Sequence, residues 1–158
     1  MTTWINEAQK YIGLKEIKGK DTNLTIKSWL SNLRSWWSDD ETPWCGTFAA
    51  HCIKSAGYGL PKHWYRAKDW LNWGQSIMEP CYGCIVVFTR DGGGHVGFVV
   101  GKDSKDRLMV LGGNQGDKVS IVPFEKSRVS GYCMPVGYSQ KTKLPLIVSS
   151  ALSSNNEA

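Results

Sequence analysis

The sequence has no long hydrophobic run. Its longest apolar stretches are residues 85–88 and 144–148, well below the roughly 18 residues that a membrane-spanning helix requires. The N-terminal segment contains Glu7 and lacks the basic head, apolar centre and small-residue cleavage site of a secretory signal. We therefore expect synthesis in the cytoplasm without a signal peptide and without membrane insertion. If the protein acts outside the inner membrane, another factor must release or deliver it.

The sequence also lacks blocks of like charge, internal repeats and low-complexity segments. Its 19 basic and 14 acidic residues give a net charge of +5 and a pI near 9.0. The basic residues are dispersed, so the basic arm typical of nucleic-acid-binding proteins is missing. A modest positive excess suits any polyanion, including an anionic cell wall. We predict no nucleic-acid partner.

The number of cysteines is odd, so at least one thiol stays free in any intramolecular pairing. The five are Cys45, Cys52, Cys81, Cys84 and Cys133. Cys81 and Cys84 form a C-x-x-C motif, but Cys84 runs directly into an apolar stretch typical of a strand, whereas a redox motif opens a helix. No second pair of ligands follows at zinc spacing. We interpret both as small buried residues, and we predict no metal and no cofactor.

The length of 158 residues and the hydrophobic share of 41% fit one globular domain. Helical periodicity predicts helices over 3–12, 25–37, 45–56 and 67–73. β-branched runs separated by turn residues predict strands over 85–89, 95–100, 108–111 and 119–122, paired as antiparallel hairpins.

Helices followed by strands indicate an α+β fold with the helices packed on one face of the sheet. We expect the domain to span residues 1–138. Residues 139–158 are rich in serine and asparagine apart from one apolar stretch, and we expect them to form a flexible tail.

Cys45 falls in the first turn of the helix predicted over 45–56. There the positive end of the helix dipole and the unpaired backbone N–H groups favour the thiolate over the thiol. The same N–H groups can bind the oxyanion that forms when a thiolate attacks a carbonyl. Cys52 lies deeper in this helix, on its apolar face. We predict that Cys45 is a nucleophile and that Cys52 packs in the core.

A nucleophilic thiol needs a base, and the chain has three histidines. His51 lies six residues beyond Cys45, on a different face of the predicted helix. His63 lies in a loop, where a structural role is usual. His95 opens a predicted strand after three glycines, residues 92–94, which leave its ring uncrowded. We predict that His95 is the base.

The imidazole must itself be oriented by a hydrogen-bond acceptor, commonly from a neighbouring strand. Asn114 follows the strand predicted to pair with that of His95, so we predict it for this role. Gln115 and Asp117 are alternatives. Asn114 could also be only a turn residue with left-handed backbone after two glycines.

Five segments resemble, in order, the CHAP-like and NlpC-like papain-fold peptidoglycan hydrolases. They are 43–48 (PWCGTF), 70–74 (WLNWG), 83–88 (GCIVVF), 95–101 (HVGFVVG) and 111–115 (LGGNQ). The resemblance extends from Trp4 to about Pro135. It implies a papain-like fold with Cys45 as nucleophile, His95 as base and Asn114 as orienting residue. CHAP domains often carry a glutamate two residues before that asparagine, where this chain has Gly112.

The resemblance implies an endolysin-like hydrolase that cuts an amide or peptide bond of the cell-wall stem peptide through a thioester. It would act in the periplasm, after holin-dependent release from the cytoplasm. A type VI-like secreted antibacterial amidase, with an immunity protein as partner, would use the same chemistry. The eight tryptophans mostly suit a core, but we expect Trp44 and Trp64, with Gln115, to bind substrate. A thiol transferase or isopeptidase acting on proteins and a non-enzymatic wall-binding or nucleic-acid-binding module are the rival hypotheses.

Overall fold

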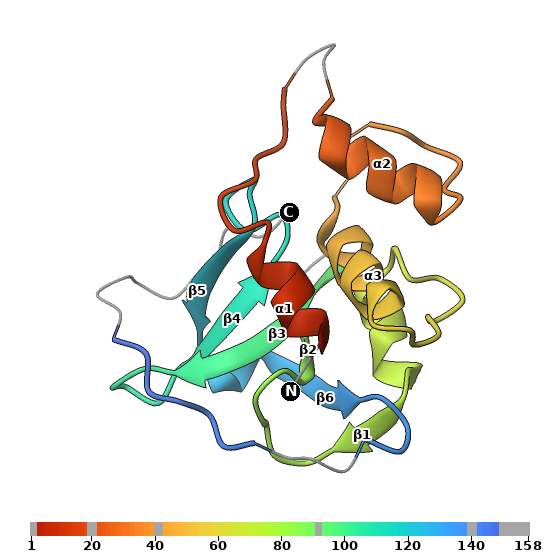
Figure 1. Cartoon of the computed structure of the whole chain (residues 1–158). Helices are drawn as coiled ribbons and strands as arrows, with labels where there is room; N and C mark the ends of the chain where they lie inside the picture. The colour runs from red at the N-terminus through yellow and green to blue at the C-terminus, as the bar shows by residue number, and fades with distance from the viewer. Residues whose placement is uncertain (1–2, 19–21, 40–42, 91–92, 139–141, 149–158) are drawn as a thin grey trace.

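The structure is a computed structural model that describes residues 3–18, 22–39, 43–90, 93–138 and 142–148. Helices occupy the first half of the chain and strands most of the second (Figure 1). The α-helices are α1 (Thr3–Gln9), α2 (Leu24–Asn32) and α3 (Cys45–Ser55), followed by a 3-10 helix, η1 (Ala67–Asn72). The α+β class predicted from the sequence is confirmed.

One antiparallel sheet of six strands, in the order β1-β6-β2-β3-β4-β5, forms the other layer. The strands are β1 (Gln75–Ile77), β2 (Ile85–Arg90), β3 (Gly93–Lys102), β4 (Leu108–Gly112), β5 (Ser120–Phe124) and β6 (Val129–Met134), with a short 3-10 helix, η2 (Lys126–Arg128), before β6. All four predicted strands are present. Two further strands, β1 and β6, were not predicted from the sequence, although β6 lies inside the sheet between β1 and β2.

Two helices end earlier than their apolar periodicity predicts. α1 stops at Gln9, and Gly13, at φ +96°, donates its N–H to the Val119 carbonyl at 2.8 Å. α2 stops at Asn32, short of the predicted end at Trp37, because Arg34 adopts a left-handed backbone with φ 58°. In both places a local turn overrides the continuing apolar pattern, and Trp37 is left outside the helix.

The core lies between α3 and the centre of the sheet. Phe48 of α3 packs against Phe98 of β3, with 6.3 Å between ring centroids. Trp4, Trp29, Trp44 and Trp70 are each at most 1% exposed. Their ring nitrogens remain paired, as when Trp4 Nε1 donates to the Gly83 carbonyl at 2.7 Å. Most of the tryptophans therefore serve packing, as expected.

Residues 142–148, expected to belong to a flexible tail, are hydrogen-bonded to the sheet in the structure. The Lys102 N–H donates to the Pro145 carbonyl at 2.9 Å, and the Ile147 N–H donates to the Lys102 carbonyl at 2.8 Å. Ile147 also packs over Gly101, where any added Cβ would lie 2.6 Å from its Cδ1. This segment therefore pairs with the last residue of β3, Lys102, through an isolated bridge at Leu146. Residues 139–141 and 149–158 lie outside the described residues.

Among the described residues, no helix is both long enough and apolar enough to cross a membrane.

Candidate active site

Cys45 begins α3, the helix that packs on the sheet next to β3. Trp44 occupies the N-cap position and its side chain makes no capping hydrogen bond. Side-chain capping therefore does not consume the N–H groups of the first turn. The thiol is buried, with Cys45 only 4% exposed. A buried thiol at an uncapped helix N-terminus has the electrostatic setting predicted for a nucleophile.

His95 lies beside this thiol. Burial raises the pKa of Cys45, but the hydrogen bond and charge of His95, with the backbone N–H groups of Val96 and Gly46, outweigh it. The resulting pKa lies below that of an ordinary thiol. The structure thus brings together the two residues that the sequence analysis selected as nucleophile and base.

The His95 imidazole lies beside a pair of phenylalanine rings in the interior. Phe88 and Phe124 stack on each other at 4.3 Å. The imidazole lies nearly parallel to both, 5.6 Å from Phe124 and 6.3 Å from Phe88, at interplanar angles of 14° and 22°. Phe88 pairs with His95 across β2 and β3. His95 is fully buried, and its ring is part of this aromatic group.

Gln115 makes the hydrogen bond that orients His95. Its Oε1 lies 2.9 Å from His95 Nε2. Its Nε2 donates to the Val110 carbonyl at 3.1 Å and to the Ser120 carbonyl at 2.8 Å. Because the amide nitrogen faces two acceptors, the oxygen must face the histidine, and His95 Nε2 must carry a proton. In the neutral ring, Nδ1 is then the basic nitrogen available to the Cys45 proton.

Asn114, predicted to orient His95, does not hold that place. Its backbone is left-handed, with φ 59°, which is the turn alternative identified from the sequence. Its side chain is buried, and neither Oδ1 nor Nδ2 has a hydrogen-bond partner among the described residues. The turn at Asn114 instead brings the following residue against the imidazole. Gln115, 2% exposed and fully paired, is correspondingly not free to bind substrate as expected.

Gly112 gives Gln115 the space for this contact. A Cβ at position 112 would lie 2.4 Å from Gln115 Oε1 and 3.4 Å from His95 Nε2. Contacts below about 3 Å are not tolerated, so a side chain at 112 and the Gln115 amide exclude one another. The missing glutamate at 112 and the amide at 115 were both visible in the sequence. Only the turn geometry shows that they are linked.

The two tryptophans expected to bind substrate have different surroundings. Trp44 is 1% exposed, and its Nε1 donates to Glu16 Oε1 at 3.1 Å. Its ring lies against Gly113, where an added Cβ would be 2.9 Å from Cε3. Trp44 is therefore packed in the interior beside the nucleophile, and its contact with substrate remains a prediction. Trp64 is half-buried, and its backbone lies against Gly46.

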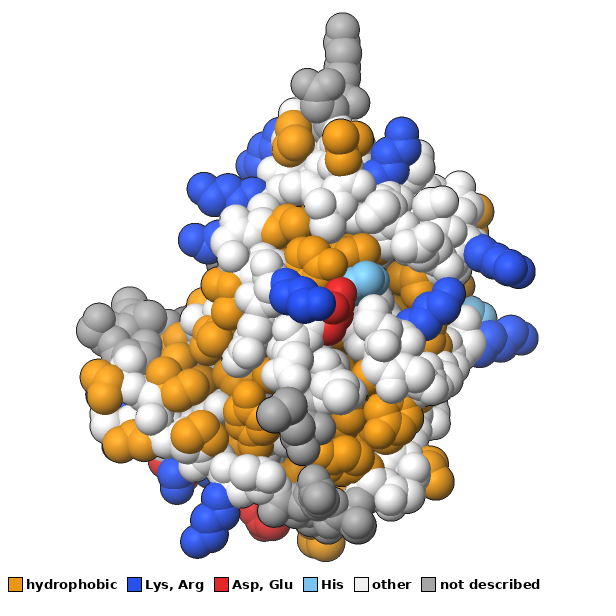
Figure 2. Space-filling view, viewed as in Figure 1, with side chains coloured by type: hydrophobic (Ala, Val, Ile, Leu, Met, Phe, Trp, Pro, Cys, Tyr) orange, Lys and Arg blue, Asp and Glu red, His pale blue; other side chains and the backbone are white. Residues whose placement is uncertain are grey.

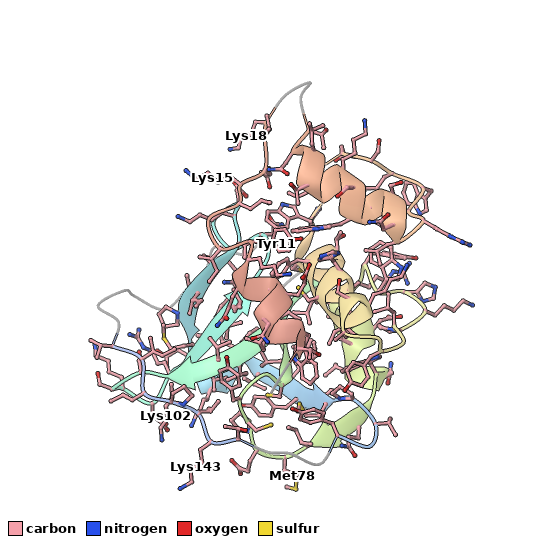
Figure 3. The ribbon with its side chains drawn as sticks, viewed as in Figure 1. Tyr11, Lys15, Lys18, Met78, Lys102 and Lys143 are labelled. Atoms are coloured by element: carbon pink, nitrogen blue, oxygen red, sulfur yellow. The ribbon has the colours of Figure 1, made fainter. Side chains whose placement is uncertain are left out.

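The remaining histidines take structural positions. His51 Nε2 pairs with Glu7 Oε2 at 2.8 Å, and the imidazole stacks on Trp29 at 5.0 Å. This hydrogen bond links α3 to α1, next to Tyr11, which lies below α2 in Figure 3. His63 Nδ1 pairs with Asp69 Oδ2 at 3.0 Å.

The other thiols are buried and differ electrostatically from Cys45. Burial raises the pKa of Cys52 and of Cys84 well above the ordinary value, and burial also raises that of Cys133. Cys81 and Cys84 are buried, as predicted, and Cys84 leads into β2. Within the described part of the chain, no three His, Cys, Asp or Glu side chains form a group that could hold a metal.

Residues 37–114 match the family model of the CHAP domain. The matched region contains Cys45 and His95 and ends at Asn114. This supports the CHAP-like assignment predicted from the five sequence segments, and the α+β structure is consistent with the papain-like fold of that family. CHAP domains are typically hydrolases, either amidases or peptidases. No match was found among curated proteins.

Proposed function

We propose that this CHAP-like protein hydrolyses an amide or peptide bond in the stem peptide of bacterial peptidoglycan. Cys45 is the nucleophile, His95 the general base and acid, and Gln115 the residue that orients His95. The observation that carries the proposal is the thiol at the uncapped N-terminus of α3, paired with an imidazole whose far nitrogen is held by Gln115 at 2.9 Å. This arrangement suits acyl transfer.

The reaction begins when His95 Nδ1 takes the proton of Cys45. The thiolate sulfur bonds to the substrate carbonyl carbon, and the oxyanion is stabilised by N–H groups at the start of α3. The C–N bond then breaks, and the imidazolium protonates the leaving amine. Water, deprotonated by His95, hydrolyses the thioester to a carboxylate and restores the thiol. Gln115 Oε1 accepts a hydrogen bond from His95 Nε2–H throughout and keeps Nδ1 directed at the sulfur.

Digestion of purified Gram-negative peptidoglycan tests this proposal. Wild type should release soluble fragments, and their masses identify the bond that is cut. Cys45→Ala should release none while remaining folded by circular dichroism. Cys52→Ala is the matched control, because it removes a second buried thiol from the same helix and should retain activity. Release of the same fragments by Cys45→Ala would exclude this nucleophile.

The same chemistry fits two biological settings. We propose endolysin-like action on the periplasmic wall after holin-dependent release. A neighbouring gene for an immunity protein would instead indicate a secreted antibacterial effector. If the folded, reduced protein leaves peptidoglycan intact but transfers acyl groups between proteins, it is a thiol transferase or isopeptidase with the same site.

A further inference from the structure

An aromatic cluster that the chemistry does not use lies near the nucleophile. It consists of Trp36, Trp37, Trp64 and Tyr65. Trp37 contacts the other three rings, at centroid distances of 5.0, 5.7 and 5.4 Å. Trp36 is 86% exposed, and the others are half-buried. Exposed aromatic rings gathered in this way mark binding surfaces on soluble proteins.

The cluster is fixed against the first turn of α3. A Cβ at Gly46, the residue after Cys45, would lie 2.4 Å from the Trp64 carbonyl oxygen and 3.0 Å from the Tyr65 carbonyl carbon. The Trp64 carbonyl oxygen also accepts a hydrogen bond from Trp70 Nε1 at 2.9 Å. The backbone of Trp64 and Tyr65 is thereby held between α3 and η1, against the residue that follows Cys45.

Three cations flank Trp64 and Tyr65 in sequence, two in the same loop and one, Lys68, in η1. Lys62, Arg66 and Lys68 are exposed, and none has a carboxylate within ion-pair distance among the described residues. The Arg66 guanidinium lies 5.6 Å from the centre of the Tyr65 ring. Lysine and arginine side chains stand along the right edge of Figure 2, the side on which Figure 1 draws the loop after α3.

Lys68 connects this surface to the catalytic histidine. Its Cγ would lie 3.2 Å from a Cβ built on Gly94, the residue before His95. Lys68 thus lies against the residue before His95, while Arg66 lies on the Tyr65 ring of the aromatic cluster. A ligand on this surface meets both aromatic rings and positive charge.

These two features define the chemistry of a ligand. The electron-rich face of an indole attracts the weakly positive C–H groups on the apolar face of a sugar ring. Lysine and arginine bind carboxylates. A stem peptide carries carboxylates and is joined at one end to a sugar of the glycan strand, so a glycan-linked stem peptide provides both groups within one short ligand.

We propose that the aromatic cluster binds the saccharide of a glycan-linked stem peptide while Lys62, Arg66 and Lys68 bind its carboxylates. This inference rests on the proposed function and narrows its substrate. The enzyme prefers peptides that are still attached to glycan over free peptides of the same sequence.

Titration calorimetry on Cys45→Ala protein tests the preference without turnover. The ligands are a disaccharide-linked tetrapeptide from peptidoglycan and the same tetrapeptide without sugar. We expect the sugar-bearing ligand to bind about 3- to 10-fold more tightly. Adding Trp36→Ala should remove most of this advantage and leave the affinity for the free peptide unchanged. Met78→Ala is the control, because Met78 is 93% exposed at the base of the molecule in Figure 3, far from α3.

Equal affinity for the two ligands, or a preference that Trp36→Ala leaves unchanged, would overturn the inference. Binding of single-stranded DNA would also overturn the inference if Trp36→Ala and Lys68→Ala abolish it while the sugar preference remains. The surface would then bind a nucleic acid. Cleavage of peptidoglycan by wild type without any sugar preference would refute only this inference. Sugar-dependent binding without cleavage would support the binding surface and refute the proposed chemistry.

Discussion

At the scale of single residues, the identity of the group that orients His95 decides how the site works. In this chain the oxygen of a neutral amide, Gln115 Oε1, accepts a hydrogen bond from His95 Nε2–H. A carboxylate would stabilise an imidazolium by full charge, whereas an amide does so by a dipole alone. Gln115 therefore selects the tautomer of His95 more than it stabilises its charged form.

We expect Gln115→Ala to lower kcat about 10- to 100-fold with little change in KM, since a misoriented base slows proton transfer. Asn114→Gly is the matched control. It removes the neighbouring buried amide, which has no hydrogen-bond partner among the described residues, and glycine accepts the left-handed backbone there. Steady-state kinetics on a soluble muropeptide measure both variants. A larger loss from Asn114→Gly than from Gln115→Ala would return the orienting role to Asn114.

A side chain at position 112 and the Gln115 amide compete for the same space beside His95, and paired substitutions can test this. Gly112→Glu alone should abolish activity, because its Cβ would lie 2.4 Å from Gln115 Oε1. Gly112→Glu combined with Gln115→Ala should recover part of the kcat lost in Gln115→Ala, since a carboxylate then occupies the space beside His95. If the two positions share one role, the effects of the two substitutions on kcat should not add in the double variant. Additive losses of kcat would show that the two positions act independently.

The thiols differ in a way that alkylation can measure. The pKa of Cys45 is lowered, while those of Cys52, Cys84 and Cys133 are raised. Because a lower pKa gives more thiolate at a given pH, iodoacetamide should modify Cys45 first, and the pH midpoint of its modification should lie below that of an ordinary thiol. Mass spectrometry of digested peptides follows each site. His95→Ala should shift the pH midpoint of Cys45 modification upward, because His95 lowers the pKa of this thiol. An unchanged midpoint would mean that His95 does not influence Cys45.

At the scale of elements, α3 packs closely against the loop before η1 beside the nucleophile. Gly46→Ala would place a Cβ 2.4 Å from the Trp64 carbonyl oxygen, a backbone atom that cannot rotate away. We expect a loss of about 1–3 kcal/mol in the free energy of unfolding, typical of overpacking, together with reduced activity. Urea denaturation and peptidoglycan digestion measure these two effects.

Gly59→Ala is the control for that substitution. A Cβ at Gly59 meets nothing within 4 Å, and its φ is not positive. It should leave both stability and activity close to wild type. Equal effects of the two substitutions would mean that the contact between Gly46 and Trp64 has no special importance.

At the scale of the whole molecule, the chain after the sheet contributes to the stability of the domain. Residues 142–148 form hydrogen bonds with Lys102, and the Thr142 carbonyl accepts a hydrogen bond from the Tyr82 N–H at 2.9 Å. Truncation after Tyr138 should therefore lower the midpoint of thermal unfolding. Truncation after Val148 retains these contacts and should lower it less. Equal midpoints for the two truncated chains would support the flexible tail expected from the sequence.

The sequence alone determined the α+β class, the strands β2 to β5, the position of Cys45 at the start of a helix and the choice of His95 as its partner. These features depend on local patterns: apolar periodicity, glycine boundaries and a cysteine directly before a helical run. β6 was not predicted because Ser130 and Gly131 interrupt its apolar alternation. Its pairing with β1 and β2, far away in the chain, stabilises it nonetheless.

Only the tertiary structure decided which amide orients His95 and which tryptophans face solvent. Asn114 and Gln115 are adjacent and chemically alike, and the left-handed turn at Asn114 together with the absent side chain of Gly112 selects between them. Trp44 and Trp36 are likewise the same residue type, yet one is 1% and the other 86% exposed. Such outcomes depend on contacts between distant segments, because steric exclusion acts between atoms that are close in space, whatever their separation along the chain.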